Sequence, residues 1–320
     1  MRSKSPIRPP RLARGNRVAL VAPAGPLLER DDLTRAEALC RALGYEPQLG
    51  PNTARHYGYF AGTDEQRLAD LNDALRNPDV AAIWCIRGGY GVTRILDQVD
   101  FDALARRPRP LIGYSDITAV LMAELHHAGV VTFHAPMARV AMPPFSRWHF
   151  ERVLASPEPV GRLGRLPERP DVLLPRENRI TALRGGVAEG PLMGGNLSLI
   201  QCLVGTRHLP ALEGAILFLE DVGEDLYRVD RMLAHLRMVG ALERVAGVAI
   251  GRFTDLKRGM SDGALGFDEV LATYFLPLGI PVAYGFPVGH IDDQWTLPLG
   301  VRARLDADAG ELELLEPAVV

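Results

Sequence analysis

The sequence predicts an α/β protein built on a parallel sheet. In the first 140 residues, short apolar runs alternate with helix-length segments, as in "RVALVAPAG" (17–25) followed by "DDLTRAEALCRALG" (31–44). The run "VAAIWCI" (80–86) is almost continuously apolar, which is typical of a strand covered on both faces. Strands separated by helix-length connections form βαβ units, with parallel strands and right-handed crossovers.

Each further element of this first unit has its own signal. Thr63 and Gln66 have the spacing of a capping box, and a leucine stripe follows, which predicts a helix. The stretches "RPLIGYS" (109–115) and "VVTFHAP" (130–136) predict strands, and "DITAVLMAELHHAG" (116–129) between them predicts a helix. Ligands bind beyond the carboxyl ends of parallel strands, so the loops "APAGP", "RGGYG" and "GYSD" are expected to meet at one rim.

The second half of the chain predicts a separate, mixed unit. From about 141 to 190 the sequence is rich in Pro, Arg and Gly without a sustained period, which predicts a connection. Beyond it, "AILFLED", "VAGVAIGRF", "PVAYGF", "VRARLDA" and "ELELLEP" predict strands, and "EDLYRVDRMLAHLRMVG" predicts a helix. The expected division is a basic tail at 1–15, an α/β domain at 16–145, a linker at 146–185 and a second domain at 186–320.

Composition argues against several classes of function. A net charge of −3 gives no attraction to nucleic acid or to an anionic membrane, and the basic N-terminal tail is expected to be solvated. No stretch approaches the roughly 20 apolar residues that span a bilayer. Cys40, Cys85 and Cys202 lie far apart, which favours a reducing cytoplasm over a disulfide framework or a zinc site. No metal-binding motif is present.

The corner "GYSD" (113–116) is the first candidate for chemistry. Gly113 and Ser115 match the first half of the nucleophile elbow G-x-S-x-G, but Ile117 replaces its second glycine. Taken alone, the corner is better explained if Ser115 caps the helix that begins at Asp116. A serine there would nevertheless expose its oxygen at the sheet rim, where the next N–H points the same way.

A glycine loop on the neighbouring strand could stabilise an oxyanion. In "CIRGGYG" (85–91), Gly88 and Gly89 let backbone N–H groups approach a ligand closely. The spacing matches neither the P-loop nor the dinucleotide-binding fingerprint. We therefore favour an oxyanion hole made by the N–H groups of Gly89 and Asp116 over a phosphate-binding loop. Cys85 is a rival nucleophile, but its position inside an apolar run favours a buried, inert thiol.

A nucleophilic serine also needs a base and a carboxylate. His290 follows a strand within "GFPVGHIDDQWTLPLG" (285–300), a loop dense in Gly and Pro that suits a fixed general base. Glu220 closes the apolar run "AILFLED", where a carboxylate requires a partner. Each residue alone is better explained structurally, Glu220 by capping a helix or by pairing with Arg228. The order Ser…Glu…His is, however, used by hydrolases with an elbow on a parallel sheet.

Five motifs together resemble the LD-carboxypeptidase family of serine peptidases: "IWCIRGGYG", "LIGYSDIT", "PLMGGNLSLI", "LFLEDVGEDLYRVDRML" and "GFPVGHIDDQWTLPLG". The family includes muramoyltetrapeptide carboxypeptidases and microcin C immunity proteins. The resemblance implies a triad of Ser115, Glu220 and His290, and an oxyanion hole from Gly89 and Asp116. It also implies a flavodoxin-like or amidotransferase-like first domain, a smaller second domain with barrel-like strands, and a cleft between them. Family members are typically cytoplasmic homodimers without metal or cofactor.

The resemblance implies that the chain hydrolyses the terminal L–D peptide bond of a murein tetrapeptide. An acyl-enzyme would form, and D-alanine would be released during cell-wall recycling. Arg87 and Arg94 are candidates for binding the terminal carboxylate, and Gly88 and Asn196 for lining the cleft.

Two alternatives remain open. An immunity-type amidase would cleave peptidyl-adenylate analogues by the same chemistry. The stretch 151–195 has no Trp, Tyr or Phe on which a nucleobase could stack, which favours the murein substrate. A non-catalytic two-domain binding protein would lack a member of the triad, and all three residues are present.

Overall fold

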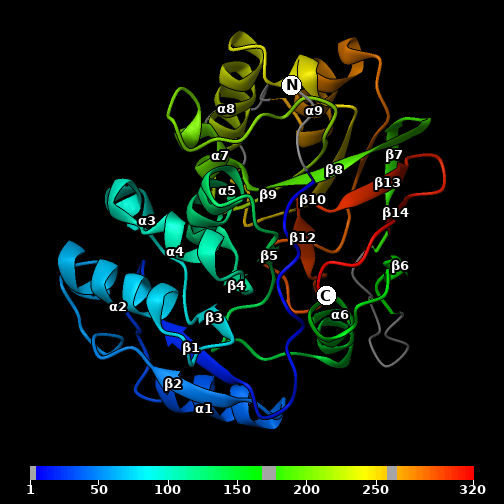
Figure 1. Ribbon diagram of the computed structural model, residues 1–320. Helices are drawn as coiled ribbons and strands as arrows, with labels where there is room; N and C mark the ends of the chain where they lie inside the picture. The colour runs from blue at the N-terminus through cyan, green and yellow to red at the C-terminus, as the bar shows by residue number, and fades with distance from the viewer. Residues whose placement is uncertain (1–4, 168–177, 258–264) are drawn as a thin grey trace, which may run out of the picture.

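The computed structural model describes residues 5–167, 178–257 and 265–320, and two sheets organise them (Figure 1). The first sheet has the order β12-β5-β4-β3-β1-β2. Strands β1 to β5 are parallel, and their order 2-1-3-4-5 is that of flavodoxin-like folds, which confirms the predicted class. The six strands are β1 (Arg17–Val21), β2 (Glu46–Leu49), β3 (Ala82–Cys85), β4 (Leu111–Gly113), β5 (Thr132–His134) and β12 (Leu297–Leu299).

Helices connect the parallel strands of this sheet as the sequence predicts. The helix α2 begins with the expected capping box, in which Gln66 N donates to Thr63 Oγ1 and Thr63 N donates to Gln66 Oε1. The two side chains thereby satisfy N–H groups that a helix start leaves unpaired. The helical elements are α1 (Asp32–Ala42), α2 (Asp64–Arg76), α3 (Val92–Ile95), η1 (Leu96–Gln98), α4 (Phe101–Arg106), η2 (Ser115–Ile117) and α5 (Thr118–His127).

The second sheet is mixed, with the order β6-β14-β13-β8-β9-β10-β11-β7. Its centre, β8 to β11, is parallel, and antiparallel strands flank it on both sides. Its end strands, β6 and β7, do not pair with each other in the described part, so the expected barrel-like strands form an open sheet. The strands are β6 (Gly161–Arg162), β7 (Thr181–Arg184), β8 (Val187–Asn196), β9 (Ile216–Val222), β10 (Gly247–Thr254), β11 (Val282–Tyr284), β13 (Arg302–Asp306) and β14 (Glu311–Leu314).

The remaining helical elements lie mostly beside this second sheet: α6 (Pro144–Ala155), α7 (Leu197–Leu203), α8 (Leu226–Met238), η3 (Leu242–Arg244), α9 (Phe267–Phe275) and η4 (Leu276–Leu278). No helix in the described ranges is long and apolar enough to cross a membrane.

The first part of the segment 146–185, which was expected to be a linker, forms the greater part of a helix. The helix α6 buries Ser146, His149, Phe150, Val153 and Leu154, which lie on one helical face. Its proline falls in the first turn, where a helix tolerates the missing N–H. Residues 168–177 of this segment lie outside the described residues.

Residues 7–12 of the N-terminal tail, which was expected to be solvated, are held by backbone hydrogen bonds. Ile7 N donates to Gly129 O at 2.7 Å and Leu12 N donates to Leu154 O at 2.8 Å, while Leu12 is 1% exposed. The segment runs past the C-terminal end of the chain, where Arg11 N donates to Val320 O (Figure 1). Backbone hydrogen bonds and the burial of Leu12 hold this basic segment, although Ile7 is 47% exposed.

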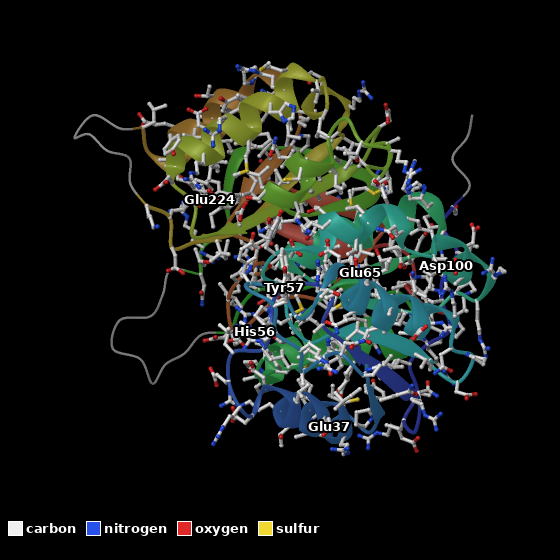
Figure 2. All side chains as sticks on the ribbon, turned by 90° about the vertical axis from the view of Figure 1, so that its left-hand side faces the viewer. Glu37, His56, Tyr57, Glu65, Asp100 and Glu224 are labelled. Atoms are coloured by element: carbon white, nitrogen blue, oxygen red, sulfur yellow. The ribbon has the colours of Figure 1, made fainter. Side chains whose placement is uncertain are left out.

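The late strand β12 joins the two sheets. It pairs antiparallel with β5, and Gly300, which follows it, donates a backbone hydrogen bond to Leu192 of β8. Figure 2 shows His56 and Tyr57, which follow β2, on the same face as Glu224, which follows β9.

The helix α5 lies between the two sheets (Figure 1), and its Glu124 is fully buried. Neither carboxyl oxygen of Glu124 has a hydrogen-bond partner among the described residues. Burial raises the pKa of this carboxyl to about 8, and Arg109 opposes the shift.

Glu124 makes stability depend on pH, because the folded state keeps a proton that the unfolded state has released. The free energy of unfolding therefore falls as pH rises from about 4.5 to about 8. We expect the free energy of unfolding of Glu124→Gln to lack this fall. As pH rises from about 5 to about 8.5, the difference in this free energy between the variant and the wild type should grow by roughly 2 kcal/mol or more in favour of the variant. Urea unfolding at both pH values measures the effect. The same pH dependence in both proteins would refute it.

Candidate active site

The corner at Ser115 presents one side chain from buried surroundings. From Leu111 to Leu125, Ser115 is the only residue that is not buried. Its φ of 60° lies in the left-handed region, which a residue with a Cβ adopts only when its surroundings impose it. Ser115 is the first residue of η2, and Tyr114 occupies the capping position. The corner is therefore not explained by Ser115 as an ordinary N-cap.

Glycines bring two further loops against this corner. A Cβ on Gly88 would lie 2.9 Å from Ser115 Cβ and 3.1 Å from Ser115 Oγ. Gly25, in the loop after β1, donates its N–H to Gly88 O at 2.9 Å. These loops follow β1 and β3, between which the strand order reverses, and ligands bind at such a reversal.

The expected oxyanion donors, Gly89 and Asp116, belong to two loops that a hydrogen bond connects. Gly89 is exposed, with a φ of 108°. Asp116 is the second residue of η2, so helix geometry leaves its N–H without an intrahelical acceptor. The carboxylate of Asp116 accepts the N–H of Val92 at 2.9 Å, which ties the glycine loop to the serine corner. Burial raises the pKa of this carboxyl to about 6.

We expect Gly88→Ala to lower kcat about 100-fold, because its methyl group would displace Ser115 and misplacements near 1 Å have effects of this size. Initial rates on a murein tetrapeptide, with a thermal melt, measure the effect. Gly266→Ala is the matched control, since its new Cβ would meet its nearest atom at 3.4 Å. Equal rates for Gly88→Ala and the wild type would show that the close approach is irrelevant.

The second sheet supplies an acid–imidazole pair. Glu220, in the second half of β9, is fully buried, and its Oε2 lies 2.8 Å from Nδ1 of His290, whose side chain is 20% exposed. Burial raises the pKa of Glu220, and its hydrogen bond with His290 opposes the shift. A Cβ on Gly289 would lie 3.1 Å from that same carboxylate oxygen, so a glycine before His290 permits the approach.

Tyr114 connects this pair to the serine corner. Its ring centroid lies 4.9 Å from that of His290, and Ser115 is its neighbour in the chain. Because Nδ1 of His290 is bonded to Glu220, Nε2 is the ring nitrogen left for a reacting group. Tyr114 therefore lies beside the imidazole of His290 and next to Ser115 in the chain.

Two residues that sequence reasoning missed hold the His290 loop. Ser146 Oγ donates to Asp292 O at 3.1 Å and accepts from Gln294 N at 2.8 Å. Gln294 is fully buried. Its place in the sequence did not indicate a role for it. Ser146 lies in the segment expected to be a linker, and only the helical face of α6 could have pointed to it.

The other predicted site residues have different surroundings. Cys85 is fully buried and burial raises its thiol pKa, so it does not fit a nucleophile. Asn196 caps α7 through Leu199 N and donates to Asp221 Oδ1 at 3.0 Å, which gives it a structural role. Arg94 forms a bidentate ion pair with Asp64. Substrate contact by Asn196 or Arg94 stays a prediction.

The described part of the chain holds no group of three or more His, Cys, Asp or Glu side chains arranged for a metal ion. The functional groups described around the corner are the hydroxyl of Ser115, the imidazole of His290, the carboxylate of Glu220 and backbone N–H groups.

Comparison with known proteins shows the family of this chain. Residues 18–135 match the model of the LD-carboxypeptidase N-terminal domain, and residues 189–305 match that of the C-terminal domain. The chain is 37% identical to a murein tetrapeptide carboxypeptidase of Pseudomonas aeruginosa, over 91% of this chain and 94% of that protein.

Two solved structures share the fold. A muramoyltetrapeptide carboxypeptidase from Oxalobacter formigenes is 35% identical, with a TM-score of 0.79, over 93% of this chain and 98% of that one. The microcin C7 self-immunity protein MccF, known from Escherichia coli, has been solved with aspartyl sulfamoyl adenosine. That structure is 25% identical, with a TM-score of 0.89, over 98% of this chain and all of that one.

Proposed function

The chain belongs to the LD-carboxypeptidase family and is a serine-type carboxypeptidase, and we propose that it releases D-alanine from murein tetrapeptides through a Ser115–Glu220–His290 triad. The observation that carries this proposal is the 2.8 Å contact between Glu220 and His290, beside the strained corner of Ser115. The triad supplies a nucleophile, a general base and the carboxylate that orients the base.

In the proposed mechanism, His290 Nε2 takes the proton of Ser115 Oγ as this oxygen attacks the carbonyl of the terminal peptide bond. Glu220 keeps the proton on Nδ1 and stabilises the imidazolium that forms. His290 then gives its proton to the leaving amine, D-alanine departs, and an ester on Ser115 remains. Water activated by His290 hydrolyses that ester and releases the tripeptide.

The carbonyl oxygen becomes negatively charged during both attacks. The N–H groups of Gly89 and Asp116 would donate to it, and removal of one such donor typically costs about 100- to 1000-fold in kcat. The link from the Asp116 carboxylate to Val92 N supports this assignment, because it ties the two donor loops together.

The product analysis that tests the function uses a murein tetrapeptide with a D-alanine terminus. Mass spectrometry should find tripeptide and free D-alanine in equal amounts. A tetrapeptide ending in L-alanine is the control and should stay intact. Cleavage inside the peptide, or no cleavage, would overturn the proposal.

The family resemblance also supports a homodimer that acts in the cytoplasm during cell-wall recycling. Light scattering of the purified chain tests the dimer, and a monomeric mass would overturn it. Fractionation of cells that produce the protein tests its location.

A second candidate function is an amidase acting on peptidyl-nucleotide analogues. Its support is an aromatic group beside the glycine loop, where Tyr59 and Tyr90 are 66% and 49% exposed and lie 5.9 Å apart. These rings provide a stacking surface that the stretch 151–195 lacks. Incubation with aspartyl sulfamoyl adenosine tests it, since free aspartate would appear only if this bond is cut.

A further inference from the structure

A cluster of charged side chains lies where the order of the first sheet reverses. Arg87 lies two residues after β3 and directly before Gly88, where an added Cβ would meet Ser115. Its guanidinium donates to Pro26 O, in the turn that follows β1. Arg139 comes from the loop after β5, and Met137 of this loop approaches Gly88. Three loops thus meet beside the serine corner.

One carboxylate faces these two guanidinium groups. Asp32, at the start of α1, is fully buried, and its Oδ1 lies 3.3 Å from Arg139 Nη1. Its Oδ2 already accepts the N–H groups of Leu28 and Glu29, at 3.0 Å and 3.1 Å. Asp32 can therefore neutralise only one of the two positive charges.

The uncompensated charge is partly withdrawn from water. The side chain of Arg139 is 30% exposed, and its Nε is a buried donor without a partner among the described residues. Burial and the charge of Arg139 both lower the pKa of Arg87, so the two guanidinium groups act on each other. Such a pair is stabilised when an anion enters, and guanidinium forks fit a carboxylate.

We propose that Arg87 and Arg139 bind the terminal carboxylate of the substrate and restrict hydrolysis to the last peptide bond. In a terminal peptide bond, only one residue separates the attacked carbonyl from the free carboxylate, which suits a site adjoining the glycine loop. Arg94, the other arginine predicted for this task, already has Asp64 as its partner. The inference rests on the proposed carboxypeptidase function.

The test compares two substrates that differ in one charge: the murein tetrapeptide and the same peptide ending in D-alaninamide. The wild type should cleave the free acid with a kcat/KM at least about 10-fold higher, as expected for hydrogen bonds to a charged group. Arg139→Gln and Arg87→Gln should each remove most of this preference, by lowering kcat/KM for the acid and leaving that for the amide nearly unchanged.

Arg35→Gln is the matched control. Arg35 lies on α1, the helix that also carries Asp32, is 51% exposed and pairs with Glu29. Its loss should therefore leave the preference for the free acid intact. Should Arg139→Gln unfold because Asp32 loses its partner, Arg87→Gln decides the question. Equal wild-type rates on both substrates, or an unchanged preference in Arg87→Gln, would overturn the carboxylate site. No cleavage of either substrate would instead overturn the proposed function.

Discussion

Ser115→Ala lowers the release of D-alanine by at least about 10,000-fold, the loss expected when a triad loses its nucleophile. No other described hydroxyl combines the exposure of Ser115 with the left-handed corner and the neighbouring glycine loop. Alanine keeps the Cβ that packs against Gly88, so the melting temperature should change little. Chromatography of the products measures the rate, and a thermal melt checks the fold.

Ser156→Ala is the control for this substitution, because Ser156 follows α6 and lies apart from the serine corner. It should keep the wild-type rate. Undiminished turnover by Ser115→Ala would contradict the nucleophile assignment, and the reaction would then need a different attacking group.

Glu220→Gln has the second largest expected effect, a loss of roughly 10,000-fold in kcat. The amide has nearly the shape of the carboxylate, so the buried position should stay filled. It carries no charge, however, and its NH₂ group can donate to Nδ1 of His290, which favours the wrong tautomer. Steady-state kinetics on the murein tetrapeptide measure the loss.

Glu224→Gln is the matched control for Glu220→Gln. Glu224 is a carboxylate four residues further along the chain, at the surface shown in Figure 2, and its nearest ionic partner is Arg228 at 3.9 Å. Wild-type kinetics are expected. Similar rates for Glu220→Gln and Glu224→Gln would show that the contact between Glu220 and His290 has no part in the reaction.

Local patterns predicted most of the first domain. Its apolar runs became β1, β3, β4 and β5, and the capping box at Thr63 begins α2 as expected. The helix α6 was missed because a proline-rich composition concealed a buried helical face of five residues, three of them apolar. The place of β12 was missed for another reason. Its pairing with β5 joins residues about 160 positions apart, which no local pattern encodes.

The candidate site, too, could be predicted from the sequence only in part. Ser115, Glu220 and His290 could be chosen because each was expected at or after the end of a strand and because the five motifs occur together. Sequence alone left Ser115 better explained as a helix cap, and the structure resolved this by placing Tyr114 in the capping position. The contacts of Arg139 with Asp32 and of Ser146 with Gln294 depend on tertiary packing, so sequence reasoning had no access to them.

The most direct test of the triad is to map the residue that a fluorophosphonate probe labels in the wild-type protein. Such a probe reacts with a serine that a neighbouring base has activated. The account predicts a single adduct on Ser115, loss of D-alanine release in proportion to labelling, and no adduct in His290→Ala. Labelling of another residue, or full turnover by protein whose Ser115 is completely labelled, would contradict it.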